Sequence, residues 1–157
     1  MNVRRIVTGH DAEGRAIVQV DSQVANVQSR RPGHEAAVIW STQGFPVDNA
    51  ASEDGAEREI ASTVPNGSVF RIVSYGPGCA PRLHRTDSID YGVVMSGKID
   101  MELDNGVVVH LKAGDVFVQR GTLHNWVNNG AEPCVIAFVL IDATPVSTSD
   151  GTLSARG

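Results

Sequence analysis

Short β-prone runs separated by turn residues make up most of the chain, and no segment after residue 60 has the i, i+3, i+4, i+7 apolar spacing of an amphipathic helix. The run 98–103, KIDMEL, alternates strictly, so its apolar side chains share one face and its acidic side chains the other. Asp104, Asn105 and Gly106 then supply residues that suit a tight hairpin. The pattern predicts an all-β domain with strands at 3–8, 15–20, 36–42, 68–75, 90–95, 98–103, 107–111, 115–119, 124–128 and 134–141.

The two ends of the chain differ from this regular middle. Residues 43–66 carry prolines, glycines and the acidic run SEDGAERE, which predicts an exposed loop with one helical turn near 56–61. Such a loop either covers a pocket or a neighbouring subunit, or lies free in solvent. We expect an N-terminal arm of strands and loop at 1–64, a β-domain core at 65–142 and a flexible polar tail at 143–157.

Composition excludes several classes of protein. With 157 residues, 41% of them hydrophobic, the chain can build one domain with an ordinary core. A net charge of −5, with scattered lysines and arginines, argues against a nucleic-acid partner. No apolar run approaches the roughly 20 residues that span a bilayer, and none resembles a signal peptide, so we expect a cytoplasmic protein without membrane contact. The two cysteines have no CxxC spacing and predict neither a disulfide framework nor a structural zinc site.

Three residues could meet inside a closed β-barrel: His84, Asp90 and His124. Strand side chains repeat every two residues, so His84, Thr86 and Asp90 share one face if the strand continues without a bulge. Two imidazoles and one carboxylate can hold iron, manganese, nickel or zinc and leave positions open for a substrate. These residues therefore predict a divalent metal site.

The same residues also allow chemistry without metal. His84 or His124 could act as a general base that Asp90 orients, while Tyr91, Tyr75 or Thr86 donates to a developing oxyanion. A buried ion pair of His84 and Asp90 without a catalytic role is the third interpretation.

Further residues are candidates for contacts with a small-molecule substrate. Trp126, Phe117 and Trp40 could form the walls of a pocket, as could Tyr91. Arg120, at a turn near the expected barrel mouth, could hold a substrate carboxylate in bidentate fashion. The remaining histidines are predicted to lie at the surface; they are His10, His34 and His110.

Two motifs give the chain a resemblance to a known family. The first reads G-x5-H-x-H-x3/4-E-x6-G in the cupin superfamily and is matched here by Gly78, His84, Thr86, Asp90 and Gly97. The second reads G-x5-P-x-G-x2-H-x3-N and is matched by Gly114, Gly121, His124 and Asn128, with Gln119 in place of the proline and one residue nearer Gly114. Residues 65–142 therefore resemble a cupin, which implies a small β-barrel or jelly roll.

The resemblance also implies ligands and an assembly. In metal-binding cupins the histidines and the glutamate of the two motifs hold the ion, which transfers to His84, Asp90 and His124. The position of the second histidine holds Thr86, a poor ligand, and Asp90 is one methylene shorter than glutamate, so both departures weaken metal affinity. Small cupins commonly form dimers through their N-terminal strands, and we expect a homodimer.

These observations leave three functions open. The leading prediction is a metal-dependent enzyme of the lyase, decarboxylase or oxygenase type that acts on a small carbonyl- or carboxylate-bearing molecule. The alternative enzyme is a metal-free dehydratase or isomerase with histidine–aspartate acid–base chemistry. The third possibility is a small-molecule-binding cupin without catalysis.

Overall fold

The computed structural model describes residues 1–157 and consists of β-strands, turns and loops without a helix. All ten strands predicted from the sequence are present within a few residues of their expected bounds, so the all-β class is confirmed. The strands are β1 (Arg4–His10), β2 (Ala16–Gln23), β3 (Gln28–Arg31), β4 (His34–Gln43), β5 (Gly67–Tyr75), β6 (Ser88–Ser96), β7 (Lys98–Leu103), β8 (Val108–Lys112), β9 (Val116–Arg120), β10 (His124–Val127), β11 (Cys134–Asp142), β12 (Val146–Thr148) and β13 (Gly151–Leu153).

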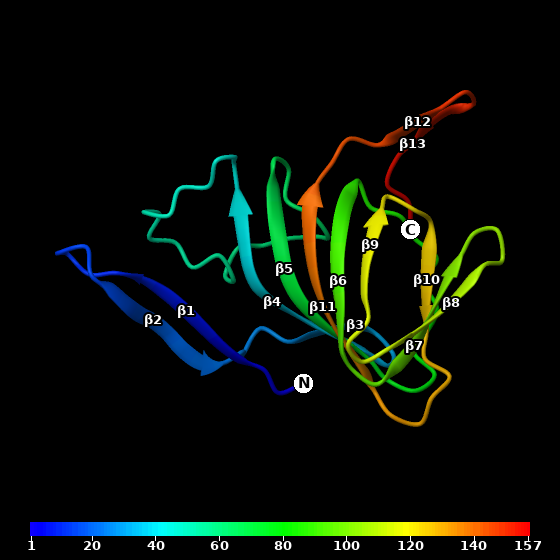
Figure 1. The fold of residues 1–157 in the computed structure, drawn as a ribbon, viewed down its shortest axis with the longest axis horizontal. Helices are drawn as coiled ribbons and strands as arrows, with labels where there is room; N and C mark the ends of the chain where they lie inside the picture. Colours follow the sequence, from blue (N-terminus) through cyan, green and yellow to red (C-terminus); the bar gives the residue numbers. More distant parts are fainter.

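Two antiparallel sheets enclose the core. A six-stranded sheet in the order β3-β4-β5-β11-β6-β9 lies beside a three-stranded sheet in the order β10-β7-β8 (Figure 1). Strand β11 is paired on both sides, which agrees with its nearly continuous apolar run, CVIAFVLI. The fully buried side chains of Val69, Val94, Trp126 and Ile136 lie between the sheets. No helix is present that could cross a membrane.

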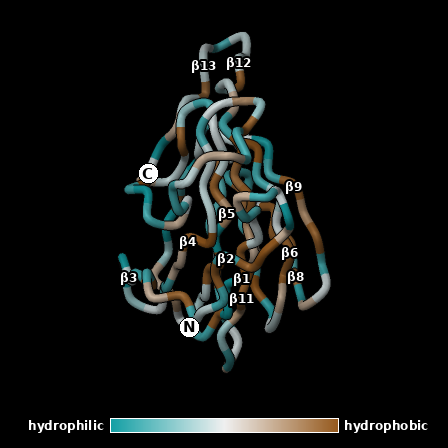
Figure 2. Tube along the Cα trace, turned by 90° about the vertical axis from the view of Figure 1, so that its left-hand side faces the viewer, coloured by the Kyte–Doolittle hydropathy of each residue, from teal (hydrophilic) through white to brown (hydrophobic).

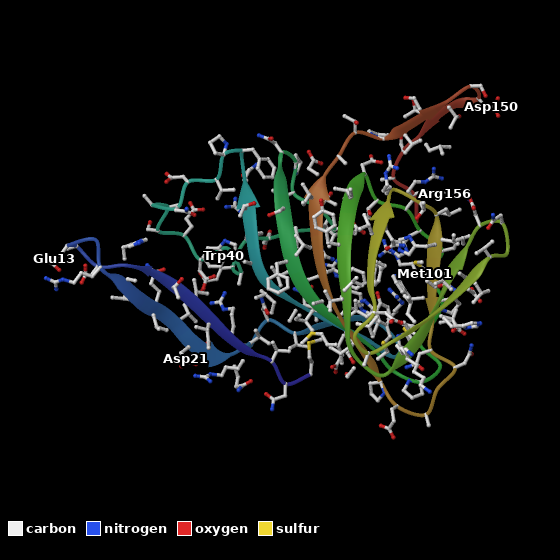
Figure 3. The ribbon with its side chains drawn as sticks, in the orientation of Figure 1. Glu13, Asp21, Trp40, Met101, Asp150 and Arg156 are labelled. Atoms are coloured by element: carbon white, nitrogen blue, oxygen red, sulfur yellow. The ribbon has the colours of Figure 1, made fainter.

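The main sheet begins earlier in the chain than the expected boundary at residue 64. Strand β4 pairs with β5 from His34 to Gln43, so residues 28–43 belong to this sheet, and only 1–23 form a separate hairpin. The hairpin β1–β2 projects from the barrel, with Glu13 at its tip (Figures 1 and 3). Turns and bends stand where a helical turn was expected at 56–61, and this loop makes contacts to the arm and to the barrel.

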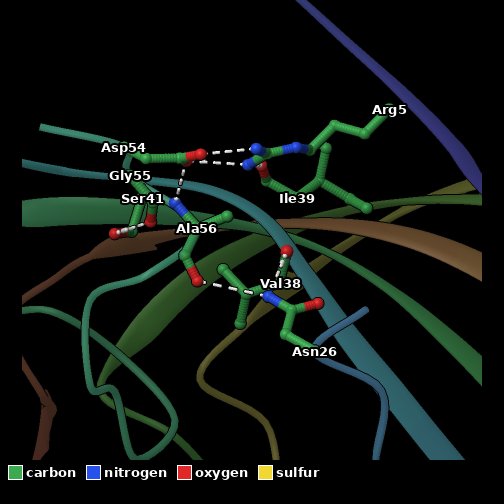
Figure 4. Close-up of polar contacts among 8 residues, drawn as sticks. All are labelled: Arg5, Asn26, Val38, Ile39, Ser41, Asp54, Gly55 and Ala56. Carbon is green, nitrogen blue, oxygen red and sulfur yellow. Dashed lines mark hydrogen bonds and ion pairs between the residues drawn. The ribbon is translucent and has the colours of Figure 1, made fainter. Parts of the chain in front are cut away.

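Those contacts connect the loop 54–62 to the arm and to β4. Arg5 on β1 forms a bidentate ion pair with Asp54, and its two N–O distances are 2.5 and 2.7 Å (Figure 4). Asn26 donates to the carbonyls of Val38 and Ala56, at 2.9 and 3.2 Å. The loop is therefore an ordered wall beside the barrel.

The C-terminal tail also folds back. Ser149 and Asp150 form the turn of the hairpin β12–β13, whose tip projects from the barrel with Asp150 at its end (Figure 3). The chain then returns, and Arg156 exchanges two backbone hydrogen bonds with Arg85, at 2.8 and 3.0 Å. The tail consequently lies next to His84.

Candidate functional site

A backbone bridge brings two histidines together. His84, in the loop before β6, and His124, the first residue of β10, exchange two backbone hydrogen bonds of 2.9 Å each. Residues paired in this way send their side chains to the same face. Their ring centroids lie 4.3 Å apart, which places the imidazoles in contact.

Each imidazole is held in a defined tautomer. Nδ1 of His84 lies 2.9 Å from the carbonyl of Arg82, and Nδ1 of His124 lies 2.9 Å from the carbonyl of Thr122. Because a carbonyl can only accept, Nδ1 carries the hydrogen in both rings and Nε2 keeps a free lone pair. Burial, with a smaller effect of His124, lowers the pKa of His84 to about 4, and burial also lowers the pKa of His124. Both rings are neutral at pH 7.

A chain of hydroxyl groups holds the carboxyl group of Asp90. The Oγ of Ser88 lies 2.6 Å from Oδ1 of Asp90 and 2.8 Å from Oγ1 of Thr86. A serine hydroxyl has one proton, so Ser88 donates to the carboxylate and accepts from Thr86. Asp90 is only 6% exposed, and this burial raises its pKa despite the hydrogen bond from Ser88.

The structure does not show the predicted three-ligand metal centre, although His84, Asp90 and His124 line one cavity. No group of three histidine, cysteine, aspartate or glutamate side chains in the structure could hold a metal ion. The two imidazoles contact each other, whereas the hydroxyl chain of Ser88 and Thr86 holds the carboxyl group of Asp90. Thr86 also leaves the ligand set that the resemblance implies one histidine short.

Two adjoining cavities give access to these groups. An inner cavity of about 70 Å³ is lined by His84, His124, Thr86 and Asp90, with Trp126 in its wall. An outer cleft of about 1080 Å³ is bounded by residues 22–26, β3, β4 and the loop 54–62. Several residues line both spaces and so mark their junction: Arg31, His34, Ala36, Ser62, Arg71 and Arg82.

Aromatic side chains pack against one another in the wall of the inner cavity. Trp126 is 2% exposed, and its ring centroid lies 5.7 Å from that of His124 and 5.3 Å from that of Phe117. Phe117 also packs edge-on against Phe138, so it supports the wall from behind. Trp126 therefore lies at the cavity as expected, with Phe117 one layer further out.

Three predicted site residues lie elsewhere. Tyr91 follows Asp90 on β6, and because strand side chains alternate it points to the outer face, where it is 48% exposed. Trp40 packs against Gly55 of the loop 54–62 and lines neither cavity. Arg120 ends β9 on the exposed side. The prediction that Tyr91, Trp40 and Arg120 lie at the cavity is therefore wrong, because none of the three lines it.

Three residues at the cavities were not predicted as site residues from the sequence. Arg71 shares strand parity with Val69, Val73 and Tyr75, so a cation on an otherwise apolar face was the available signal. His34, predicted at the surface, packs edge-on against Tyr75, and burial lowers its pKa to about 4. Gln119 replaces the proline of the second motif and is buried at the inner cavity.

Comparisons with known proteins agree with this architecture. The family description "Cupin domain" matches residues 71–141. The "Cupin-domain-containing oxidoreductase fogC" of Aspergillus ruber is 37% identical, with 92% of this chain and 74% of that protein covered. "Phomopsin biosynthesis cluster protein C'" of Diaporthe leptostromiformis is 40% identical, with 95% and 82% covered.

The fold is also shared with a solved structure of low sequence identity. The cupin domain of Schizosaccharomyces pombe Cnp3 superposes with a TM-score of 0.54 at 15% identity, covering 88% of this chain and 87% of that one. This likeness concerns the fold, whereas the two relatives are similar along most of the sequence. Together with the two sheets and the motif residues at the inner cavity, these matches establish that the chain belongs to the cupin family.

Proposed function

We propose that the protein is an enzyme that transfers protons to and from a small oxygen-bearing molecule in the inner cavity, with His84 and His124 as bases. The observation that carries this proposal is the pair of neutral imidazoles whose Nε2 lone pairs are free, since both Nδ1 atoms are occupied by carbonyls. A general base needs such a lone pair within reach of the proton that it removes. An isomerase or dehydratase follows from this chemistry.

The histidine pair suits a substrate that develops negative charge. In the free protein, burial and the adjacent ring oppose protonation of His84, which lowers its pKa to about 4. A negative charge that develops on the substrate nearby would raise this pKa, because opposite charges favour the protonated imidazole. The imidazolium is thus favoured only while the substrate carries charge.

Asp90 supplies the complementary acid. Burial raises its pKa, so its neutral form is favoured relative to an exposed aspartate, and Ser88 orients the carboxyl group. Sites that push the pKa values of titratable groups in different directions commonly divide the acid and base roles between them. In a dehydration, a histidine would take the proton from carbon while Asp90 protonates the departing hydroxyl, which leaves as water.

The test is hydrogen exchange into carbonyl compounds in heavy water. Small 2-keto and 3-hydroxy acids are incubated with the protein, and deuterium at the carbon beside the carbonyl is followed by NMR. We expect exchange that continues after chelator treatment. The variants His84→Asn and His124→Asn should reduce it by about 100-fold or more, the range of general acid–base catalysis. Asparagine is the matched change, because its amide nitrogen replaces Nδ1 while nothing replaces Nε2.

A variant outside the cavity serves as the control for the exchange measurement. Tyr91→Phe on the outer face should exchange like the wild type. Exchange that disappears with chelator and returns with iron, manganese, nickel or zinc would contradict the metal-free mechanism and restore the metal-dependent one.

An oxidoreductase is the second candidate function. The relative from Aspergillus ruber is described as a cupin-domain-containing oxidoreductase, and the similarity extends over 92% of this chain. Removal of a hydroxyl proton by a histidine is also a step in the oxidation of an alcohol, so the same cavity residues would serve. Reduction of an added electron acceptor, or consumption of dioxygen with the same substrates, distinguishes this function from isomerisation.

A further inference from the structure

Arg71 lies at the junction of the two cavities and lacks a counter-ion. Its side chain is on the inward face of β5, level with Phe138 of β11. It donates to the carbonyl of Ser62, while its Nε is buried without any hydrogen-bond partner. No carboxylate lies within 4.0 Å of the guanidinium. Buried cations are normally paired, so this donor is available to a ligand.

Two further arginines line the same junction. Arg31 donates from Nε to the carbonyl of Ala80, which orients its guanidinium without neutralising it. Arg82 donates to the backbone oxygen of Gly157 at 2.7 Å. Burial lowers the pKa of Arg71, and the nearby Tyr75 and Asp90 offset only part of this effect. The junction therefore gathers three guanidinium groups, and none of them forms a salt bridge with an aspartate or glutamate side chain.

The acidic residues of the outer cleft do not neutralise this cluster. Asp54 is engaged by Arg5, at 2.5 and 2.7 Å. Glu57 and Glu59 line the cleft, but neither lies within 4.0 Å of an arginine side-chain nitrogen. An anion that enters the cleft would thus meet, at its inner end, the guanidinium of Arg71, which no carboxylate of the cleft pairs.

Gln119 adds a second, independent requirement for a ligand. It is 4% exposed, and it donates from Nε2 to the sulfur of Met101 at 3.4 Å. Its Oε1 is buried without a partner although the side chain lines the inner cavity. A buried acceptor left unpaired costs free energy, and a ligand hydroxyl would satisfy it.

The sizes of the two spaces limit the part of the ligand that can enter. The inner cavity, at about 70 Å³, is much smaller than the outer cleft, so it suits the small end of a ligand. The outer cleft of about 1080 Å³ can hold a much larger group. The ligand therefore consists of a small polar head and a remainder that extends into the cleft.

We propose that the substrate is a hydroxy acid, or the enol of a keto acid, whose carboxylate binds Arg71 with support from Arg31 and Arg82 and whose hydroxyl donates to Gln119. A carboxylate matches the planar fork of a guanidinium better than it matches a point charge. This arrangement places the carbon that bears the hydroxyl beside the histidine pair. The inference rests on the proposed function for the location of the reaction, but the binding step can be tested separately.

The experiment measures binding of lactate, with lactamide and propionate as probes that lack the charge or the hydroxyl. Isothermal titration calorimetry should show lactate binding about tenfold or more tightly than lactamide, since charge-assisted hydrogen bonds are the stronger ones. Arg71→Met should remove this preference, whereas Arg120→Met, a matched change on the exposed side of β9, should retain it. Gln119→Met should bind lactate and propionate equally well.

The binding measurements separate results that support the carboxylate site from results that overturn it. Arg71→Lys keeps a positive charge, so an intermediate affinity for lactate would support the fork geometry even if Arg71→Met failed to fold. Equal binding of lactate and lactamide by the wild type, or unchanged preference in Arg71→Met, would overturn the proposal. Tighter binding of inorganic phosphate than of lactate would overturn the carboxylate class. If His84→Asn still binds lactate but no longer catalyses hydrogen exchange, both the binding proposal and the acid–base function are supported. If the wild type binds lactate without catalysing exchange, only the acid–base function is rejected.

Discussion

Thr86 shows how one substitution changes the chemistry that a cupin cavity can offer. Its position in the first motif holds a histidine in metal-binding cupins, but its hydroxyl here joins Ser88 in the chain that reaches Asp90. A hydroxyl donor stabilises a buried carboxyl group, whereas it is a weak ligand for a transition metal. The cavity retains two imidazoles and one oriented acid.

The lowered histidine pKa values predict a pH dependence of stability. In the folded protein the pKa of His84 is about 4, and an unfolded histidine titrates near about 6.5. Between these values the unfolded state binds more protons, so stability is present above pH ~6.5 and is lost as the pH falls toward ~4. In His84→Asn, the free energy of unfolding should fall less steeply with decreasing pH than in the wild type. The two slopes should differ by at most about 1.4 kcal/mol per pH unit when urea unfolding is measured across this window.

A second variant checks this interpretation. His34 faces the same cavity with a pKa of about 4, so His34→Asn should flatten the curve in the same way. If both variants lost stability as steeply as the wild type between pH 6.5 and 4, the histidines would not be buried in their neutral form.

At the scale of elements, β6 and β9 depend on a glycine under an aromatic ring. A Cβ on Gly92 would lie 2.0 Å from the ring of Phe117, its partner across the two strands. The ring in turn supports Trp126. Gly92→Ala should therefore destabilise the fold by about 1–3 kcal/mol through overpacking, although alanine costs less backbone entropy.

The rescue experiment identifies the cause. In the double variant Gly92→Ala with Phe117→Leu, the smaller leucine side chain leaves room for the new Cβ. The loss of stability measured by thermal unfolding should therefore be smaller than the sum of the losses in the two single variants. Additive losses would indicate that the glycine is required for some reason other than the ring of Phe117.

The arm and the loop 54–62 form a second unit, joined by Arg5 and Asp54. Arg5 lowers the pKa of Asp54, so the pair contributes above pH ~4 and is lost as the pH falls below this value. Asp54→Asn should increase hydrogen–deuterium exchange in β1 and in residues 54–62 at pH 7. Asp21→Asn, which removes an exposed pair with Arg4 within the hairpin, should leave the loop unchanged; equal exchange in the two variants would contradict this coupling.

The sequence predicts these elements unevenly. Alternation and turn residues locate ten of the thirteen strands. Those of the barrel have a buried face and a clear boundary, whereas β2 is located by its β-branched residues although it is mostly exposed. The sequence does not locate β3 or the tail hairpin, which are short, polar and exposed. For the site, spacing brings His84, Thr86, Asp90 and His124 to one cavity, but the orphan groups of Arg71 and Gln119 depend on packing across strands that one sequence does not reveal.

At the scale of the molecule, an exposed apolar face suggests how two copies would assemble. Tyr91, Val93, Val116 and Val118 are 44–72% exposed on the outer side of β6 and β9. Hydrophobic residues recur along these strands in Figure 2. The projecting hairpin β1–β2 also exposes apolar side chains, among them Ile6 at 54%. Exposed apolar surfaces of this kind mark contacts between proteins.

We expect a homodimer in which this outer face is covered by a second copy. Analytical ultracentrifugation should show twice the mass of the chain for the wild type and a monomer for Val118→Glu, because a charge in an apolar interface is costly to desolvate. Val146→Glu, on the tail hairpin, is the matched control and should remain dimeric. A monomeric wild type at micromolar concentration would contradict the expectation.

The state of the two cavity histidines tests the central claim most directly, because it needs no substrate. Long-range proton–nitrogen NMR of ¹⁵N-labelled protein reports the tautomer and the pKa of each imidazole. At pH 7, with and without chelator, we predict neutral His84 and His124 with hydrogen on Nδ1 and a free Nε2, and titration of His84 near pH 4. Nε2 signals that shift or broaden until a chelator is added, together with a change at Asp90, would show a three-ligand metal site and contradict the acid–base account.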